Sequence, residues 1–307
     1  MITEVSSVLG LKRGTVALVP HETAWEVEAA RTIEKLKGIL GDVTVDIQHV
    51  GSTAIPAICA KPIVDIAVAV RSFAEINEKQ AELEAQGFYR RSWNDEGQEL
   101  FASGSHYDGT GDRQTHFVHV VLADSPEWRN YLNFRDYLNA FPAARKAYEK
   151  LKLSLAAANP EDAGREKYTS GKHAFIRQTL RKALMWSLLG KTVHVVVDRP
   201  VGYRHVTGES TITYPLNYGY LPGILSGDGE ALDVYLLGVS EPVEEAEARI
   251  IGIVHRKDDV EDKLIGATDG RSYTREELRT AVQFQEQFFE TVIQTTEDAD
   301  REWTELC

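Results

Sequence analysis

The periodicity of the apolar residues changes at Gly190, and this change constrains the fold more than any other feature of the sequence. Before it, strand-like runs alternate with helical patterns, and the last two helices are predicted from Pro142 to Ala158 and from Glu161 to about Leu189. After it come short strands and a single C-terminal helix. Because no low-complexity linker separates the two parts, we predict two closely abutting domains, residues 1–189 and 190–307.

A length of 307 residues allows each domain to bury its own core. Strand-like runs followed by terminal helices predict an α+β first domain with a mixed sheet. Its strands are expected at residues 16–20, 43–50, 63–70, 88–93, 99–103 and 114–122, and its other helices at 24–40, 73–86 and 127–139. The second domain is predicted to be a small closed β-barrel with a C-terminal helix capped by Thr274. Its clearest strands are expected at 192–198, 234–239, 249–255 and 264–267, and its tail is expected to fray from Thr295.

The charge and composition exclude several classes of protein. A formal net charge of −13 argues against nonspecific binding to nucleic acid, which needs fields of Lys and Arg. No apolar run reaches the roughly 18 residues that a membrane helix requires. The N-terminus lacks the basic and apolar blocks of a signal peptide, and the two cysteines fit a reducing compartment. We therefore expect a cytoplasmic protein with a small-molecule partner, and a homo-oligomer is left open.

Three acidic residues, Asp228, Glu230 and Asp233, lie at spacing i, i+2, i+5 in the second half. Gly229 separates the first two, so a tight turn can aim all three carboxylates at one point. Such a cluster suits a hard cation such as Mg²⁺, whereas zinc would require His and Cys ligands that this stretch lacks. An ordinary acidic surface turn is the alternative, since Asp and Gly are common turn residues.

The residues ahead of this cluster read Tyr214-Pro215-Leu216-Asn217-Tyr218-Gly219-Tyr220. Together with the acids, this phrase resembles the signature of soluble family I inorganic pyrophosphatases. The resemblance extends from residue 191 to about residue 291 and implies an OB-like barrel, a Mg²⁺ cofactor and hydrolysis of pyrophosphate or a related phosphoanhydride. The phrases at 197–200 and 255–263 are similar to those of a divergent pyrophosphatase-like branch.

The resemblance also implies a role for each candidate residue of the second half. The catalytic residues would be Glu230, as the base, with Asp228 and Tyr218. The metal ligands would come from Asp228, Asp233, Asp258, Asp259 and Asp262. Either Asp258 or Asp259 could serve, and either Glu261 or Asp262 could complete the set. The phosphate contacts would be Lys263, Tyr218, Arg199 and Arg204.

Several positions depart from the pyrophosphatase pattern. Glu230 stands where the family has Asp, which moves the carboxylate by one methylene. The strand at 193–198 lacks the family's Lys-x-Glu pair, and residues 283–289 carry aromatic side chains where a Tyr-Lys pair is expected. The positive charge could be restored by Arg199, Arg204, Arg256 and Lys257. Arg199 could instead form an exposed ion pair with Asp198, which would contribute only about 0–1 kcal/mol.

A second pair of motifs lies in the first half of the chain. His49-Val50-Gly51-Ser52-Thr53 places a small-residue turn at the end of one strand, and the run from Ala60 to Ile66 places Asp65 on the next strand. Nucleotidyltransferase-fold enzymes begin in this way. The Gly-Ser turn lets a triphosphate approach backbone amides, and strand carboxylates hold the metal that stabilises charge at phosphorus.

These phrases resemble the GrpB family of nucleotidyltransferase-like proteins, as do those at 115–120, 131–137 and 168–175. The resemblance covers about residues 16–182. It implies a nucleotidyltransferase-like sheet with a pocket for polyphosphate. The pocket residues would be Gly51, Ser52, Lys61, Asp65, His119, Arg135 and Lys172.

The activity of this pocket is a separate question, because Asp65 is followed by Ile66 and Ala67 and therefore lacks the second carboxylate of an Asp-x-Asp motif. His116 and His119 lie three residues apart on one predicted strand and point to opposite faces, so at most one can easily join Asp65. Three residues have a purely structural alternative, as turn former, strand-end charge and solvated side chain respectively: Ser52, Lys61 and Lys172.

Three hypotheses follow from these motifs. The first is a Mg²⁺-dependent phosphoanhydride hydrolase acting on pyrophosphate or a nucleotide. In the second, the first domain transfers a nucleotidyl group and the barrel removes the released pyrophosphate. In the third, neither half is catalytic, and the protein binds phosphate or nucleotide through pockets inherited from enzymes.

Overall fold

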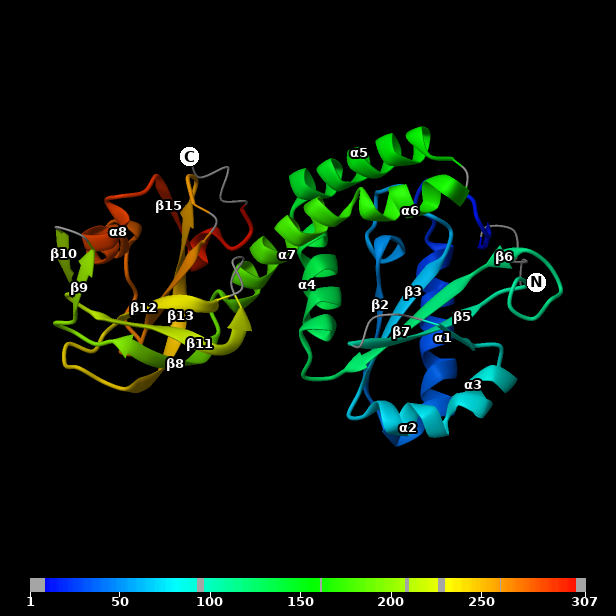
Figure 1. The fold of residues 1–307 in the computed structure, drawn as a ribbon, viewed down its shortest axis with the longest axis horizontal. Coiled ribbons are helices and arrows are strands. Elements are labelled where there is room, and N and C mark those ends of the chain that lie inside the picture. Colours follow the sequence, from blue (N-terminus) through cyan, green and yellow to red (C-terminus); the bar gives the residue numbers. More distant parts are fainter. Residues whose placement is uncertain are drawn as a thin grey trace. The chain divides into compact units, whose positions relative to one another are not determined.

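The computed structural model describes residues 9–92, 97–160, 162–207, 210–225, 230–259 and 261–301. Its internal contacts divide the chain into two compact units, one up to Leu180 and one from Arg181 onward (Figure 1). This division falls inside helix α7 (His173–Leu188), close to the predicted boundary at residue 190. No helix in the described part of the chain is long and apolar enough to cross a bilayer.

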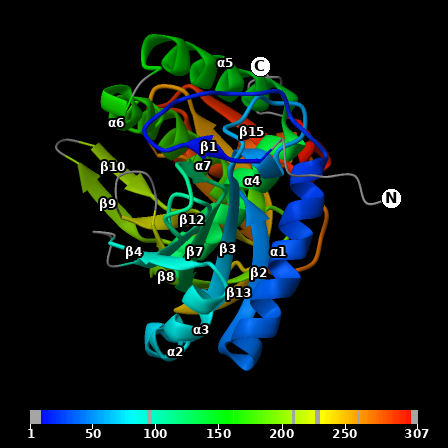
Figure 2. The same ribbon diagram turned by 90° about the vertical axis from the view of Figure 1, so that its right-hand side faces the viewer.

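The first unit is built on a five-stranded mixed sheet in the order β2-β3-β7-β5-β4 (Figure 2). Its strands are β2 (Thr44–Val50), β3 (Val64–Val70), β4 (Tyr89–Arg91), β5 (Gln98–Ser103) and β7 (His116–Leu122). β3 and β7 run parallel, and the other neighbours are antiparallel. The short strands β1 (Leu11–Lys12) and β6 (Arg113–Gln114) form a separate pair. The buried run of β3 confirms a central strand.

Helices cover both faces of this sheet. They are α1 (Ala24–Leu40), α2 (Phe73–Glu78), α3 (Gln80–Ala85), α4 (Pro126–Ala140), α5 (Pro142–Ala158), α6 (Asp162–Ser170) and α7. The apolar stripe of α1 packs on the sheet through Trp25, Ala29 and Leu36. The opposite face carries α4, whose Tyr131 ring lies 5.1 Å from the His119 ring of β7. The described part of this unit confirms the predicted α+β class.

Four predicted elements differ in the structure. The strand expected at 16–20 is only an isolated bridge between Val19 and Ala60, because Pro20 cannot donate a ladder hydrogen bond. The helix expected at 161–189 is interrupted by a turn at Gly171 and the residue after it, consistent with the low helix propensity of glycine. The helix at 73–86 is interrupted at Lys79. The tail does not fray at Thr295 but continues into a 3-10 turn.

The second unit is a closed five-stranded barrel with an added strand and a C-terminal helix, as predicted. Its elements are β8 (Thr192–Arg199), β9 (Arg204–Thr207), β10 (Ser210–Thr213), β11 (Asn217–Leu225), β12 (Ala231–Leu237), β13 (Glu245–Arg256), β14 (Lys263–Ala267), α8 (Arg275–Glu286) and β15 (Thr291–Thr295). The order β14-β12-β11-β8-β13 closes because β13 also pairs with β14. β15 extends the sheet beyond β13, and β9 and β10 form a separate hairpin.

Two residues of the Tyr214–Tyr220 phrase, Asn217 and Gly219, stabilise the barrel through hydrogen bonds and close strand packing. A Cβ atom on Gly219 would lie 2.0 Å from the Val196 carbonyl oxygen, so only glycine lets β8 and β11 approach this closely. The buried Asn217 amide donates to the Glu241 carbonyl at 2.9 Å and accepts from the Val201 amide at 3.1 Å. The phrase therefore has a structural role as well as a candidate chemical one.

Candidate functional site

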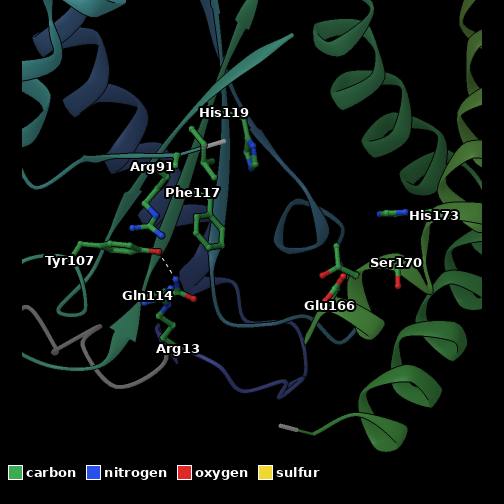
Figure 3. A pocket seen from close by; sticks show the side chains of 12 residues that line it. Arg13, Arg91, Tyr107, Gln114, Phe117, His119, Glu166, Ser170 and His173 are labelled. Carbon is green, nitrogen blue, oxygen red and sulfur yellow. Dashed lines mark hydrogen bonds between the residues drawn. The ribbon is translucent and has the colours of Figure 1, made fainter. Parts of the chain in front are cut away.

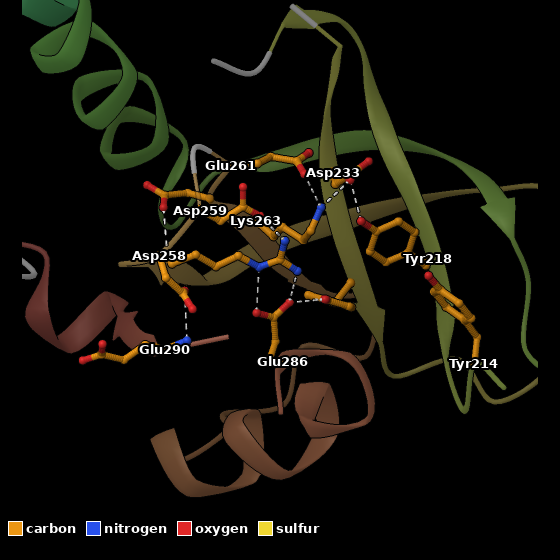
Figure 4. A network of polar contacts seen from close by, with 12 residues as sticks. Tyr214, Tyr218, Asp233, Asp258, Asp259, Glu261, Lys263, Glu286 and Glu290 are labelled. Atoms are coloured by element: carbon orange, nitrogen blue, oxygen red, sulfur yellow. Dashed lines mark hydrogen bonds and ion pairs between the residues drawn. The ribbon is translucent and has the colours of Figure 1, made fainter. Parts of the chain in front are cut away.

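The polar network of the barrel forms where β11, β12 and β14 run side by side (Figure 4). Tyr220 pairs with Asp233 and Val234 pairs with Leu264, so the register brings Tyr218, Asp233 and Lys263 to neighbouring positions. Lys263 Nζ lies 2.6 Å from Asp233 Oδ2 and 2.9 Å from Glu261 Oε2. Tyr218 donates its hydroxyl to the same Asp233 oxygen at 2.5 Å.

Burial controls the protonation of this network. The Lys263 side chain is only 3% exposed, whereas Asp233 and Glu261 remain partly open to solvent. Burial raises the pKa of Glu261, although its ion pair with Lys263 acts against the shift. Burial, and then the charge of Asp233, also raise the pKa of the Tyr218 phenol, so this hydroxyl keeps its proton and acts as a donor. One buried ammonium therefore balances two carboxylates.

Asp198 on β8 belongs to the same electrostatic field. Burial raises the pKa of its carboxyl, Arg199 opposes the shift, and Asp233 adds to it. Arg199 donates to the Tyr214 hydroxyl at 2.7 Å, and its guanidinium lies 5.1 Å from the centre of the Tyr218 ring. Arg199 is thus held by two tyrosines of the signature phrase, beside the carboxylate network.

The other three predicted metal ligands that the structure describes have different partners. Asp258 accepts a hydrogen bond from the Glu290 amide at 3.0 Å. Asp259 pairs with the Arg256 guanidinium at 2.9 Å. Asp262 accepts from the Arg256 amide at 3.1 Å and contacts His255 Nδ1 at 3.1 Å. Each of these three carboxylates therefore has a partner outside the network of Tyr218, Asp233 and Lys263.

The predicted cluster of carboxylates is therefore not assembled among the residues that the structure describes. Within those ranges, no three His, Cys, Asp or Glu side chains are placed to hold a metal together. Asp228 lies outside the described residues, while Glu230 is exposed just before β12. Arg204 is exposed on the β9–β10 hairpin. Spacing in the sequence cannot show that Asp258, Asp259 and Asp262 turn toward β13 and β15 instead.

A buried ion pair connects α8 to the barrel. Glu286 accepts from Arg256 Nε at 2.9 Å and from Arg256 Nη2 at 2.6 Å, and both side chains are almost fully buried. The Tyr235 hydroxyl donates to the same carboxylate, and the Phe289 ring lies 3.7 Å from the Arg256 guanidinium. Arg256, predicted only as compensating charge, thus anchors the helix; the sequence alone did not reveal Glu286 as its partner.

In the first unit, the Gly51-Ser52 turn packs directly on Asp65. Gly51 has φ +70°, and a Cβ atom there would lie 2.5 Å from Asp65 Oδ2. Ser52 forms a hydrogen bond with the Tyr148 hydroxyl of α5. Burial raises the pKa of that phenol to about 12, and the hydrogen bond with Ser52 opposes the shift. His119 Nε2 lies 3.5 Å from Asp65 Oδ1. The structure thus brings Gly51, Asp65 and His119 together.

The two histidines of β7 lie on opposite faces of the sheet, as their spacing predicted. His116 faces α1, where its Nε2 lies 3.2 Å from the Thr32 hydroxyl and 3.6 Å from the Glu28 carboxylate. Burial lowers the pKa of His116 to about 4, so this imidazole is neutral near pH 7. Of these two histidines, His119 is the one in contact with Asp65.

Lysine and tyrosine side chains alternate beside the Gly51-Ser52 turn. Lys61 and Lys172 place their ammonium groups 4.2 Å and 4.6 Å from the centre of the Tyr168 ring. Lys152 lies 4.7 Å from the centre of the Tyr148 ring and donates to the Cys59 carbonyl at 2.6 Å. Burial lowers the pKa of Lys172, and it lowers the pKa of Lys152 to about 7.

Tyr148 and Lys152 were absent from the predicted pocket, yet the sequence held a signal for them. Their spacing of four residues repeats that of Tyr168 and Lys172. Arg135, in contrast, has a connecting role: it donates to the Gln48 side chain and the His49 carbonyl, both at 3.0 Å, and pairs with the neighbouring Asp136. It joins α4 to β2.

Residues 15–182 match the family described as GrpB protein, and this match covers more than half of the chain. The chain belongs to the GrpB family. Residues 192–301 match inorganic pyrophosphatase. The GrpB domain (residues 15–182) is therefore fused to an inorganic pyrophosphatase domain (residues 192–301), which contains the barrel, α8 and β15.

Three relatives illustrate the extent of the GrpB likeness. The chain is 37% identical over 177 residues to the glutamate-rich protein GrpB of Alkalihalophilus pseudofirmus, covering 57% of this chain and 99% of that protein. It is 31% identical over 171 residues to the UPF0157 protein YqkA of Bacillus subtilis, covering 56% of this chain and 48% of that protein. The crystal structure of the conserved protein GrpB from Enterococcus faecalis matches with a TM-score of 0.50 and 30% identity, covering 55% of this chain and 97% of the other.

Proposed function

We propose that the pyrophosphatase domain hydrolyses a phosphoanhydride, with inorganic pyrophosphate as the simplest substrate, in the presence of Mg²⁺. The observation that carries this proposal is the convergence of Tyr218, Asp233, Glu261 and Lys263 at the signature phrase. Cleaving a phosphoanhydride requires neutralisation of charge on the phosphate oxygens. The network combines carboxylates for a cation with an ammonium and a phenol for phosphate.

The donor set fits a hard cation. Asp233 and Glu261 each place a carboxylate oxygen within 3 Å of one ammonium nitrogen, so their oxygens already converge on a positive charge. Carboxylate oxygens together with substrate phosphate are the usual ligands of Mg²⁺. We propose that Asp233 and Glu261 hold the ion, joined by Asp228 from outside the described residues. When bound, the ion would polarise phosphate oxygens and lower the pKa of water.

The remaining residues have proposed roles around the substrate. Lys263 and Arg199 would neutralise phosphate charge, and Tyr218 would donate its hydroxyl proton to a phosphate oxygen. Glu230, exposed ahead of β12, would act as the base for the attacking water. Asp259 and Asp262 would hold the loop before β14 through Arg256 and His255, and Asp258 would hold it through the Glu290 amide.

Phosphate release from pyrophosphate and Mg²⁺ tests this proposal. We expect release by the full-length protein and a loss of about 10²-fold or more in the Asp233→Asn variant, because a charge-stabilising ligand is removed. Asp300→Asn is the matched control, since it removes one exposed carboxylate of the same domain. Release by the wild type at the level of Asp233→Asn would refute hydrolysis.

A second candidate function concerns the GrpB domain. We propose that it binds phosphate without transferring a nucleotidyl group, because Lys61, Lys152 and Lys172 gather beside the Gly51 turn while Asp65 has no Asp-x-Asp partner. Incubation with labelled nucleoside triphosphates and candidate acceptors discriminates the two activities. Binding without labelled product supports this proposal, whereas a labelled product would establish nucleotidyl transfer instead.

A further inference from the structure

A cavity of about 730 Å³ opens on the GrpB domain beside the Asp65–His119 pair (Figure 3). Its volume is in the range of small-molecule sites, roughly 300–1,000 Å³. One wall comes from the sheet and the segment before β7, and the opposite wall comes from α6 and the start of α7. None of the proposed pyrophosphate chemistry uses this cavity.

Strand register explains the chemistry of the sheet wall. Arg91 pairs with Leu100, and Leu100 pairs with His119, so these three residues form one row across β4, β5 and β7. Phe117 lies two residues before His119 on the same face and pairs with Asp65. With strands about 4.8 Å apart, the row extends from the middle of the sheet to its edge over about 10 Å.

The cavity is positively charged in an acidic protein. Arg13 and Arg91 both line it, and the only carboxylate among the described lining residues is Glu166. Arg91 lies 5.1 Å from the centre of the Tyr107 ring, and Arg13 hydrogen-bonds the His106 imidazole at 3.0 Å. Neither guanidinium has a carboxylate partner among the described residues. A guanidinium that lines a cavity is a suitable group to pair with an anion.

Aromatic side chains complete the cavity wall, and His119 behind it has a buried polar atom. Phe117 and Tyr107 line the same wall as the arginines, and Gln114 donates its amide to the Tyr107 hydroxyl. His119 Nδ1 is buried and has no hydrogen-bond partner among the described residues, which for a buried polar atom costs about 1–3 kcal/mol. A ligand with a planar ring would pack against the aromatic side chains of this wall.

We propose that this cavity binds a nucleoside monophosphate or a small molecule of the same chemistry, with its ring against Phe117 and its phosphate at Arg91 and Arg13. The row from His119 to Arg91, about 10 Å long, suits a ligand of that length. The proposal is independent of pyrophosphate hydrolysis, because a monophosphate contains no phosphoanhydride.

Calorimetric titration of the full-length protein with AMP, GMP, CMP and UMP tests the proposal. We expect at least one to bind, and Arg91→Gln to weaken it about tenfold, as the loss of one charge-assisted contact implies. Phe117→Leu should weaken it while inorganic phosphate binding is unchanged. The control is Arg31→Gln, which makes the same charge change on the exposed side of α1, on the other face of the sheet.

Three results would overturn the proposal. The first is that none of the four monophosphates binds. The second is that Arg91→Gln, with wild-type thermal unfolding, binds as tightly as the wild type. The third is that Asp233→Asn abolishes binding, which would place the nucleotide in the barrel instead.

Discussion

Lys263 extends its ammonium between Asp233 and Glu261 in an almost fully buried position. Its removal would leave two neighbouring carboxylates without their common cation. In the Lys263→Met variant we expect pyrophosphate hydrolysis to fall by about 10²-fold, because phosphate charge would no longer be neutralised. Phosphate release measures this, with Lys257→Met as control, since Lys257 pairs with Glu290 at the surface. Equal losses in the two variants would contradict a specific role for Lys263.

Lys152 provides a test by pH. Burial lowers its pKa from 10.5 to about 7, so between these values the unfolded chain binds more protons than the folded one. The contribution of Lys152 to the unfolding free energy must therefore rise with pH from about 7 toward 10.5, by up to about 1.4 kcal/mol per pH unit.

The Lys152→Met variant keeps the side-chain volume and removes this titration. We expect the unfolding free energy of the wild type to rise relative to that of the variant between pH 7 and pH 9, measured by urea unfolding at each pH. A difference that stays constant over this interval would show that Lys152 is charged in the folded protein throughout.

At the scale of elements, the Gly51 turn positions β2 against Asp65 of β3. In Gly51→Ala, the alanine would have a positive φ, and its Cβ atom would lie 2.5 Å from Asp65 Oδ2. We therefore expect this variant to destabilise the GrpB domain by about 1–3 kcal/mol or more. A Cβ atom on Gly38 of α1 would meet no other atom within 4 Å, and Gly38→Ala should stabilise the same domain by about 0.5–1 kcal/mol. Thermal unfolding that shows the same sign for both variants would contradict this explanation.

The Arg256–Glu286 pair fixes α8 to β13. Glu286→Ala leaves the Arg256 charge buried without its bidentate partner, and we expect a loss of about 3–5 kcal/mol. Glu276→Ala removes an exposed carboxylate of the same helix that pairs with Arg279, and should change stability by less than about 1 kcal/mol. Calorimetric unfolding compares the two variants, and similar small effects would mean that the existing pair with Asp259 is enough to compensate the Arg256 charge.

At the scale of the whole molecule, two compact units should respond separately to ligands. Mg²⁺ with imidodiphosphate, an analogue of pyrophosphate, should raise the unfolding temperature of the pyrophosphatase domain. At a ligand concentration of 100 times Kd, the free energy of unfolding should increase by about 2.7 kcal/mol. EDTA should reverse the effect. The Gly51→Ala and Glu286→Ala variants identify which transition belongs to which domain. A shift of the GrpB transition alone would contradict the proposed location of the metal.

The sequence by itself determined the two-domain division, the α+β class, the closed barrel and the family resemblance. These features depend on local signals: apolar period, turn residues and the Tyr214–Tyr220 phrase, in which Gly219 permits the close approach of two strands. The opposite orientations of His116 and His119 also followed from the two-residue period of a strand.

Only the tertiary structure decided which charged groups meet. Glu261 faces Lys263, whereas Asp258, Asp259 and Asp262 turn to other partners. The Lys152 site, the Arg256–Glu286 pair and the row from Arg91 to His119 join residues far apart in the chain. Such contacts depend on strand register and helix packing across the fold, and the spacing of residues along the chain does not encode them.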